Sequence, residues 1–187
     1  GGPESRGEHH VLDLQIYRDS LLPNFKAHLL PDLSGKVRIL SLLPGPEDAP
    51  DSSLAFMMGV AVDSLGAEGS GFFVDYRGEL DAEGFSRALD TATTVGAPIL
   101  VAGTAFAFAQ WGDIVRDGGR RVQLPAESRV METGGYKGRR KALPRRQLYQ
   151  AMEESLGIPE GYIVNEYGMT ELLSQFYEAV LPGSPAP

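Results

Sequence analysis

The chain has 187 residues, 42% of them hydrophobic, and its 17 basic and 25 acidic side chains give a formal net charge of −8. This length and apolar content are typical of one globular domain, and the negative charge argues against bulk nucleic-acid binding. Because the sequence has no cysteine, disulfides, thiolate catalysis and thiolate metal sites are excluded.

Helix-like and strand-like segments alternate in the first part of the chain. Apolar residues between positions 11 and 33 recur mostly at helical spacing and are interrupted by Pro23, so we expect two helical pieces there. Short apolar or β-branched runs predict strands, and capped runs with an apolar face predict helices. The strands are expected at 36–43 and 71–76, and the helices at 52–65 and 81–95.

The alternation continues through the second part of the chain. The run that begins at Pro144 has proline in its first turn and Gly157 after its end, as many helices do. The strands are expected at 98–102, 120–124, 129–132 and 162–166, and the helices at 105–116, at 144–156 and within 170–179.

Most of these strands are continuous apolar runs, which is the pattern of a parallel sheet buried on both faces. We therefore predict a three-layer α/β fold, with a mainly parallel sheet between two layers of helices. In such folds, ligand groups gather on loops at the carboxyl ends of the strands. We expect residues 11–180 to form a single domain, between a disordered or expression-derived segment at 1–10 and a disordered tail at 181–187.

Two glycine turns follow predicted strands near the end of the chain. Gly134 and Gly135 follow one strand, and Tyr-Gly-Met-Thr-Glu at positions 167–171 follows the next. These residue types suit a nucleotide and its metal, because an aromatic ring stacks on a base, glycine lets the backbone approach, threonine donates to a phosphate and glutamate binds Mg²⁺. The alternative is a plain turn, in which the threonine caps a helix and the glutamate favours its dipole.

With these motifs in this order, the sequence resembles the adenylate-forming superfamily of acyl-CoA ligases, luciferases and peptide-synthetase adenylation domains. In that family a glycine pair, a helix ending in Leu-Gly-hydrophobic-Pro, a strand and Tyr-Gly-x-Thr-Glu follow one another. The same order is found here between positions 99 and 171. The residues at 132–139 and 167–172 are most similar to those of the LuxE-type acyl-protein synthetases.

The resemblance implies that the protein binds ATP and Mg²⁺ and activates a carboxylic acid, most characteristically a fatty acid, for transfer to a thiol. In catalysis, Thr170 would bond the α-phosphate and Glu171 would hold Mg²⁺. The residues implied to bind the nucleotide are Gly134 and Gly135 along the adenosine, Tyr167 and Gly168 at the adenine, Asn165 or Glu166 in the adenine pocket, and Lys137 or Arg139 after the glycine turn.

The basic run from Lys137 to Arg146 has two interpretations. It is either a solvated loop and helix start, or a surface for phosphates, a carrier's prosthetic group or an acidic partner. Six cations exceed what one triphosphate needs, which favours the solvated loop.

The sequence also departs from the family. It holds no Ser/Thr/Gly-rich phosphate loop, no lid with a catalytic lysine and no cysteine to carry an acyl group. We therefore expect the central part of such an enzyme, as a fragment or a stand-alone relative. The alternatives are a non-catalytic nucleotide- or partner-binding module, or a plain α/β interaction domain.

The implied partners are the acid and an acyl-accepting protein or carrier, with no nucleic acid. No apolar run approaches the roughly 20 residues that cross a bilayer, so no membrane span is expected. The lack of cysteine is compatible with a reducing cytoplasm, where we expect the protein to reside.

Overall fold

The computed structural model describes residues 14–135, 142–167 and 175–185. Its strands form one sheet, in which the last strand pairs antiparallel with its neighbour and the others pair in parallel. The strands are β1 (Arg38–Leu42), β2 (Gly71–Phe72), β3 (Ile99–Gly103), β4 (Arg129–Glu132), β5 (Ile163–Tyr167) and β6 (Phe176–Tyr177). Their order across the sheet is β2-β1-β3-β4-β5-β6.

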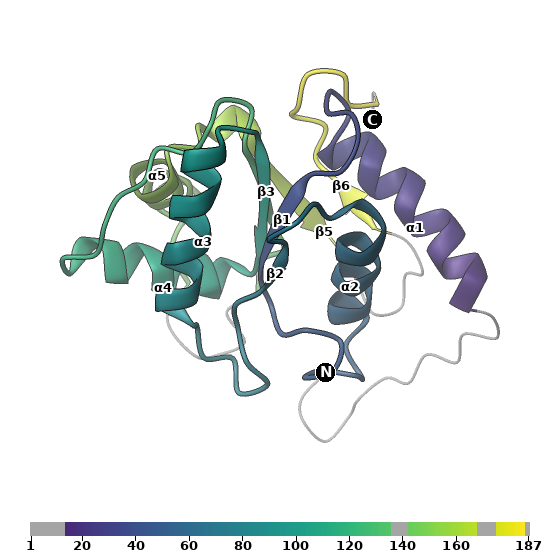
Figure 1. Cartoon of the computed structure of the whole chain (residues 1–187), viewed down its shortest axis with the longest axis horizontal. Helices are drawn as coiled ribbons and strands as arrows, with labels where there is room; N and C mark the ends of the chain where they lie inside the picture. The colour runs from purple at the N-terminus through teal and green to yellow at the C-terminus, as the bar shows by residue number, and fades with distance from the viewer. Residues whose placement is uncertain (1–13, 136–141, 168–174, 186–187) are drawn as a thin grey trace.

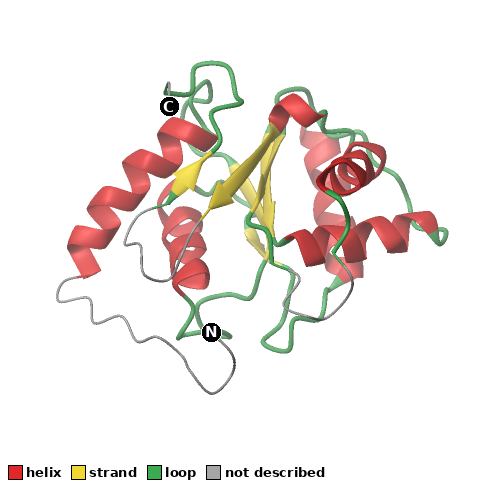
Figure 2. Cartoon of the chain, turned by 180° about the vertical axis from the view of Figure 1, so that it is seen from behind, coloured by secondary structure: helices red, strands yellow, loops and turns green. Residues whose placement is uncertain are grey.

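Helices cover both faces of the sheet, as Figure 1 and Figure 2 show from opposite sides. They are α1 (Leu14–Leu29), α2 (Ser53–Leu65), α3 (Ala82–Val95), α4 (Ala105–Arg116) and α5 (Arg145–Leu156), with a short 3₁₀ helix at Glu160–Tyr162. Helices α1 and α2 lie on one face, and α3, α4 and α5 lie on the other. The prediction of a three-layer α/β fold with a mainly parallel sheet is confirmed.

One hydrophobic core lies on each side of the sheet. In β3, Ile99 and Val101 belong to the core under α3, α4 and α5, while Leu100 and Ala102 belong to the core under α1 and α2. Consecutive side chains of a strand point to opposite faces, so only a strand that is apolar throughout can fill both cores. The continuous apolar pattern of the predicted strand at 98–102 has this cause.

The capped helices begin and end close to where the sequence predicts. Ser52 caps α2, because its hydroxyl accepts a hydrogen bond from the Ala55 backbone N–H at 3.2 Å. Asp81 caps α3 in the same way, accepting from the Gly84 N–H at 2.9 Å. Gly96 ends α3 with a φ of 74°, a left-handed conformation that glycine adopts without the strain a side chain adds. Local sequence therefore decides the ends of these helices.

The two helical pieces expected between 11 and 33 are one continuous helix in the described part of that range. Helix α1 runs through Pro23, which lacks the N–H for one helical hydrogen bond. Leu21, Phe25 and Leu29 on its inner face are all fully buried. Burial of each such side chain contributes roughly 1.5–3 kcal/mol, which together exceeds the cost of about 3 kcal/mol for an interior proline.

Three other expectations need correction. The segment 120–124 is not a strand; Val122 and Leu124 donate their backbone N–H groups to Ser155 and Leu156 at the end of α5 instead, at 3.1 and 3.0 Å. The strand expected at 71–76 is reduced to β2, after which the chain turns toward α3. The helix expected within 170–179 is wrong for its described part, where β6 pairs with β5, and residues 170–174 lie outside the described residues.

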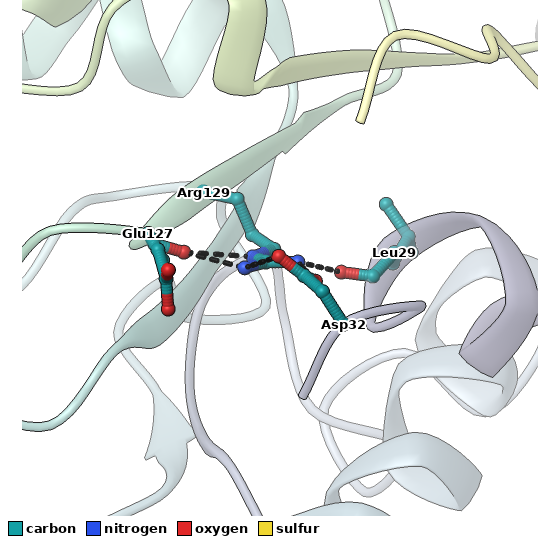
Figure 3. A network of polar contacts seen from close by, with 4 residues as sticks. All are labelled: Leu29, Asp32, Glu127 and Arg129. Atoms are coloured by element: carbon teal, nitrogen blue, oxygen red, sulfur yellow. Dashed lines mark hydrogen bonds and ion pairs between the residues drawn. The ribbon is translucent and has the colours of Figure 1, made fainter. Parts of the chain in front are cut away.

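A buried arginine ties the first helix to the sheet (Figure 3). Arg129 begins β4, is fully buried, and donates to the Leu29 carbonyl at 3.3 Å and the Glu127 carbonyl at 2.7 Å. It also forms an ion pair with Asp32, just after α1. This hydrogen bonding holds the pKa of the Asp32 carboxyl below its ordinary value. The network lies at the amino end of β4, so it supports the fold from the edge opposite the candidate site.

Candidate functional site

The carboxyl ends of β3, β4 and β5 lie side by side at one edge of the sheet. Gly103 is in register with Glu132, and Glu132 is in register with Asn165. The Gly134 carbonyl accepts a hydrogen bond from the Ala105 N–H at 2.9 Å, where α4 begins. Parallel pairing therefore brings the glycine turn after β4 next to the end of β5.

The glycine pair forms an open turn. Gly134 and Gly135 have φ values of 65° and 82°, in the left-handed region where a side chain causes strain. A Cβ atom added at either position would meet no heavy atom of the described residues within 4 Å. Gly134 is half-buried and Gly135 is exposed, so the described part of the turn leaves space on its open side.

Tyr167 ends β5 and is 57% exposed. By the alternation of side chains along a strand, its ring projects from the same sheet face as Asn165. Phe176 of β6 lies opposite Tyr167 in the antiparallel register and is 55% exposed. Two exposed rings thus lie together where β5 ends and β6 begins, on the side of β5 away from β4.

A hydrogen-bonded pair joins the ends of β4 and β5. The Asn165 Nδ2 donates to the Glu132 carboxylate Oε2 at 2.8 Å and to the Glu132 backbone carbonyl at 3.2 Å. The other carboxylate oxygen, Oε1, accepts from the Gly134 backbone N–H. Glu132 is only 4% exposed. One buried carboxylate therefore fixes both the start of the glycine turn and the side chain of Asn165.

An ion pair continues this line of polar contacts, which begins with Glu132 and Asn165, toward β6. The Glu178 backbone N–H donates to the Asn165 carbonyl at 3.0 Å, and its carboxylate accepts from Arg145 Nη1 at 2.8 Å. The Arg145 guanidinium lies 4.9 Å from the centre of the Tyr149 ring. Burial, and secondarily the charge of Glu132, raise the pKa of the Tyr149 hydroxyl to about 12, although Arg145 opposes the shift. The Tyr149 side chain is therefore uncharged where it lies beside Arg145.

Glu166 lies on the opposite sheet face from Asn165. It is 5% exposed and is in register with Tyr177 of β6. Burial, and then the charge of Glu132, raise the pKa of Glu166 to about 7. Burial and the negative charge of Glu166 also raise the pKa of Tyr17 and of Tyr177. Of the two residues expected to line an adenine pocket, Asn165 is therefore the one beside the glycine turn.

The structure brings together four of the predicted site residues. Gly134, Gly135, Asn165 and Tyr167 lie at the ends of two neighbouring strands. The others lie outside the described residues: Lys137, Arg139, Gly168, Thr170 and Glu171. Their implied roles toward phosphate and Mg²⁺ stay predictions.

Sequence reasoning missed Glu132, Tyr149 and Arg145 as parts of this region. The sequence pattern predicts Glu132 only as the last residue of a strand, although a carboxylate next to a glycine pair at a strand end is itself a signal. Arg145 belongs to the basic run for which the sequence favours a solvated loop, and its partner Glu178 is distant in sequence. No local pattern could have revealed that contact.

Within the three described ranges, no group of three or more His, Asp or Glu side chains is arranged to hold a metal ion. No helix in those ranges combines the length and apolar character needed to cross a membrane. A polar groove of about 360 Å³ runs along α5 and reaches Tyr149 and Glu160. A smaller cavity of about 90 Å³ lies at the amino ends of β1 and β3, beside Arg38 and Ile99, at the edge opposite the glycine turn.

No family model matches the sequence, and no curated protein matches it. Among solved structures, a mutant coronafacic acid ligase from Pectobacterium brasiliense is similar, with a TM-score of 0.57 and 20% identity over 88% of this chain. The chain therefore shares the fold of part of that protein. A malonyl-CoA ligase with methylmalonyl-CoA and AMP bound gives a TM-score of 0.47 and 16% identity over 89% of this chain. This chain spans only 28% and 30% of the lengths of those two ligases.

Proposed function

We propose that residues 11–180 are the nucleotide-binding region of an adenylate-forming ligase. In this reaction a carboxylate oxygen of the acid attacks the α-phosphorus of ATP, pyrophosphate leaves, and a thiol later takes the acyl group and releases AMP. The observation that carries the proposal is the open glycine turn at 134–135 beside Asn165 and Tyr167. The fold likeness to an acid ligase supports it.

Each described residue has a role that its geometry suits. The accessible backbone of Gly134 and Gly135 lies along the adenosine, and the exposed ring of Tyr167 stacks on the adenine. The side-chain amide of Asn165 meets the edge of the base. The protein then acts mainly by positioning the reactants and stabilising charge at phosphorus.

The roles of the remaining motif residues rest on the sequence resemblance. Thr170 bonds the α-phosphate, Glu171 holds the Mg²⁺ ion that ATP carries, Gly168 lets the backbone approach, and Lys137 contacts the nucleotide. We assign a fatty acid as the substrate, and a thiol on an acyl-accepting protein or carrier as the acceptor. Both assignments rest only on the LuxE-like sequence at 132–139 and 167–172.

Calorimetric titration of the chain with AMP and with ATP–Mg²⁺ tests nucleotide binding. We expect saturable binding at one site, and Tyr167→Ala should weaken it at least tenfold because the stacking surface is lost. Tyr76→Ala is the matched control, since Tyr76 is 63% exposed and follows β2 at the other end of the sheet. Absence of binding to either nucleotide contradicts the proposal.

A second candidate is a nucleotide-binding module without catalysis. In this candidate the chain binds a nucleotide at the same open glycine turn beside Asn165 and Tyr167 and carries out no acyl transfer. Pyrophosphate exchange with a panel of fatty and aromatic acids separates the two candidates. Exchange supports an active ligase, whereas nucleotide binding without exchange for any acid supports the module or a fragment of a ligase.

A further inference from the structure

The side of α5 that faces away from the core, its outer side, carries charged and amide side chains. On the inner side, Leu148, Met152 and Leu156 are buried in the core that α5 shares with α4. Within residues 14–135, 142–167 and 175–185, the side chains of Arg146 and Glu153 take part in no hydrogen bond or ion pair. The exposed residues of the helix are Arg145, Arg146, Gln147, Gln150, Glu153 and Glu154.

The charges on the outer side of α5 are ordered along the helix. The polar groove of about 360 Å³ is lined there by Arg146, Tyr149, Gln150, Glu153 and Glu160. Its arginine lies in the first turn of α5, and its two carboxylates lie in the last turn and just beyond the helix. Arg146 and Glu153 are two helical turns apart, so they lie on the same side and about 10 Å from each other along the axis.

This order of charges is complementary to itself. When two copies of α5 pack antiparallel around a two-fold axis near Gln150, Arg146 of each copy lies opposite Glu153 of the other. A two-fold interface uses the same patch of both subunits, so both pairs form together. Packed helices lie about 8–10 Å apart, a distance that an arginine and a glutamate side chain can bridge between them.

We propose that the outer side of α5 is the interface through which two copies of this chain associate. The formal net charge of −8 makes the copies repel each other, so association requires a face on which opposite charges meet. Exposed ion pairs each contribute little and are screened by salt, so the dimer is weak and forms best at low ionic strength. The interface does not depend on nucleotide binding, and its test does not measure nucleotide binding.

Sedimentation equilibrium of the chain at up to about 1 mM tests the interface. We expect the parent chain to dimerise at low salt and to dissociate as salt is added. Arg146→Glu and Glu153→Arg should each lower the association constant at least tenfold, because symmetry creates two like-charge pairs in each dimer. An equimolar mixture of the two variants should dimerise again, since one pair then has its charges exchanged and the other is unchanged.

The two substitutions change the net charge in opposite directions. Loss of the dimer in both therefore cannot come from a change in overall repulsion. Asp63→Arg is the matched control, because Asp63 is exposed on α2, on the other face of the sheet, and the substitution changes the net charge as Glu153→Arg does. This control should not weaken the dimer.

Each outcome has a distinct meaning. A parent chain that stays monomeric at about 1 mM overturns the proposal and leaves the groove to a partner of another kind. A dimer that survives both substitutions, or a mixture that stays monomeric, overturns the assignment to α5. If a charge reversal does not fold by circular dichroism, Arg146→Gln and Glu153→Gln decide. Each should lower the association constant severalfold, and an unchanged constant overturns the assignment.

Discussion

The Asn165 side-chain nitrogen and the Glu132 carboxylate meet at 2.8 Å and bind the ends of β4 and β5 together. Glu132 is buried, whereas Tyr167, which follows Asn165 by two residues in β5, is mostly exposed. This edge of the sheet therefore combines a hydrogen-bonded pair that joins two strand ends with the exposed Tyr167 ring and the open glycine turn. A binding site needs both properties, because the groups that hold a ligand must themselves be held.

The glycine turn should tolerate no side chain when a nucleotide binds. Gly134→Ala places a Cβ in left-handed backbone and should cost about 1–2 kcal/mol of folding free energy. It should also weaken AMP binding, because the Cβ occupies the open face of the turn. Gly96→Ala is the matched control, since its φ is also positive, with no atom near the added Cβ.

Urea unfolding and AMP titration of both alanine variants check this prediction. The two variants should lose similar stability, and only Gly134→Ala should lose affinity. Equal AMP affinity in Gly134→Ala and the parent chain would show that the turn is purely structural.

The ion pair of the buried Arg129 with Asp32, at the opposite edge, should matter more for stability than the ion pair beside the site. Asp32→Asn leaves the fully buried Arg129 guanidinium without its counter-charge and should cost about 3 kcal/mol. Glu178→Gln breaks a pair whose side chains are 55% and 37% exposed, so the cost should stay below about 1 kcal/mol. Urea denaturation midpoints of the two variants measure the difference, and a reversed order contradicts the assignment.

Glu166 should make stability depend on pH. Burial raises its pKa in the folded state to about 7, above the ordinary value for a glutamate, so the folded state holds this proton more tightly than the unfolded state. The contribution is fully present below about pH 4.5 and is lost as pH rises through about 7. A shift of this size corresponds to at most about 3 kcal/mol.

The variant Glu166→Gln removes this titration and should be more stable than the parent chain at pH 8. Free energies of unfolding measured between pH 5 and pH 8 should fall for the parent and stay flatter for Glu166→Gln. Glu160→Gln is an exposed control that should follow the parent curve. Parallel curves for Glu166→Gln and the parent would exclude a titrating Glu166.

The parts of the fold that sequence predicts well are those decided locally. The apolar run of β3 and the caps at Ser52 and Asp81 each carry their cause within a few residues. The glycine pair and Tyr167 could be placed near each other because parallel strands share a carboxyl edge.

The features that sequence reasoning missed depend on distant contacts. Pro23 stays inside α1 because burial of its neighbours outweighs a lost hydrogen bond. The segment 120–124 bonds to the end of α5, and β6 forms against β5 where a helix was expected. Glu132 was overlooked because its importance comes from Asn165 on another strand. Such pairings become visible only when the chain is folded.

The most direct test of the nucleotide-binding edge is to follow backbone amide resonances of the labelled chain while AMP is added. The largest shifts should occur at Gly134, Gly135, Asn165 and Tyr167, with none at Arg38 and Ile99 on the opposite edge of the sheet. Absence of AMP-dependent shifts, or shifts confined to that opposite edge, would contradict the account.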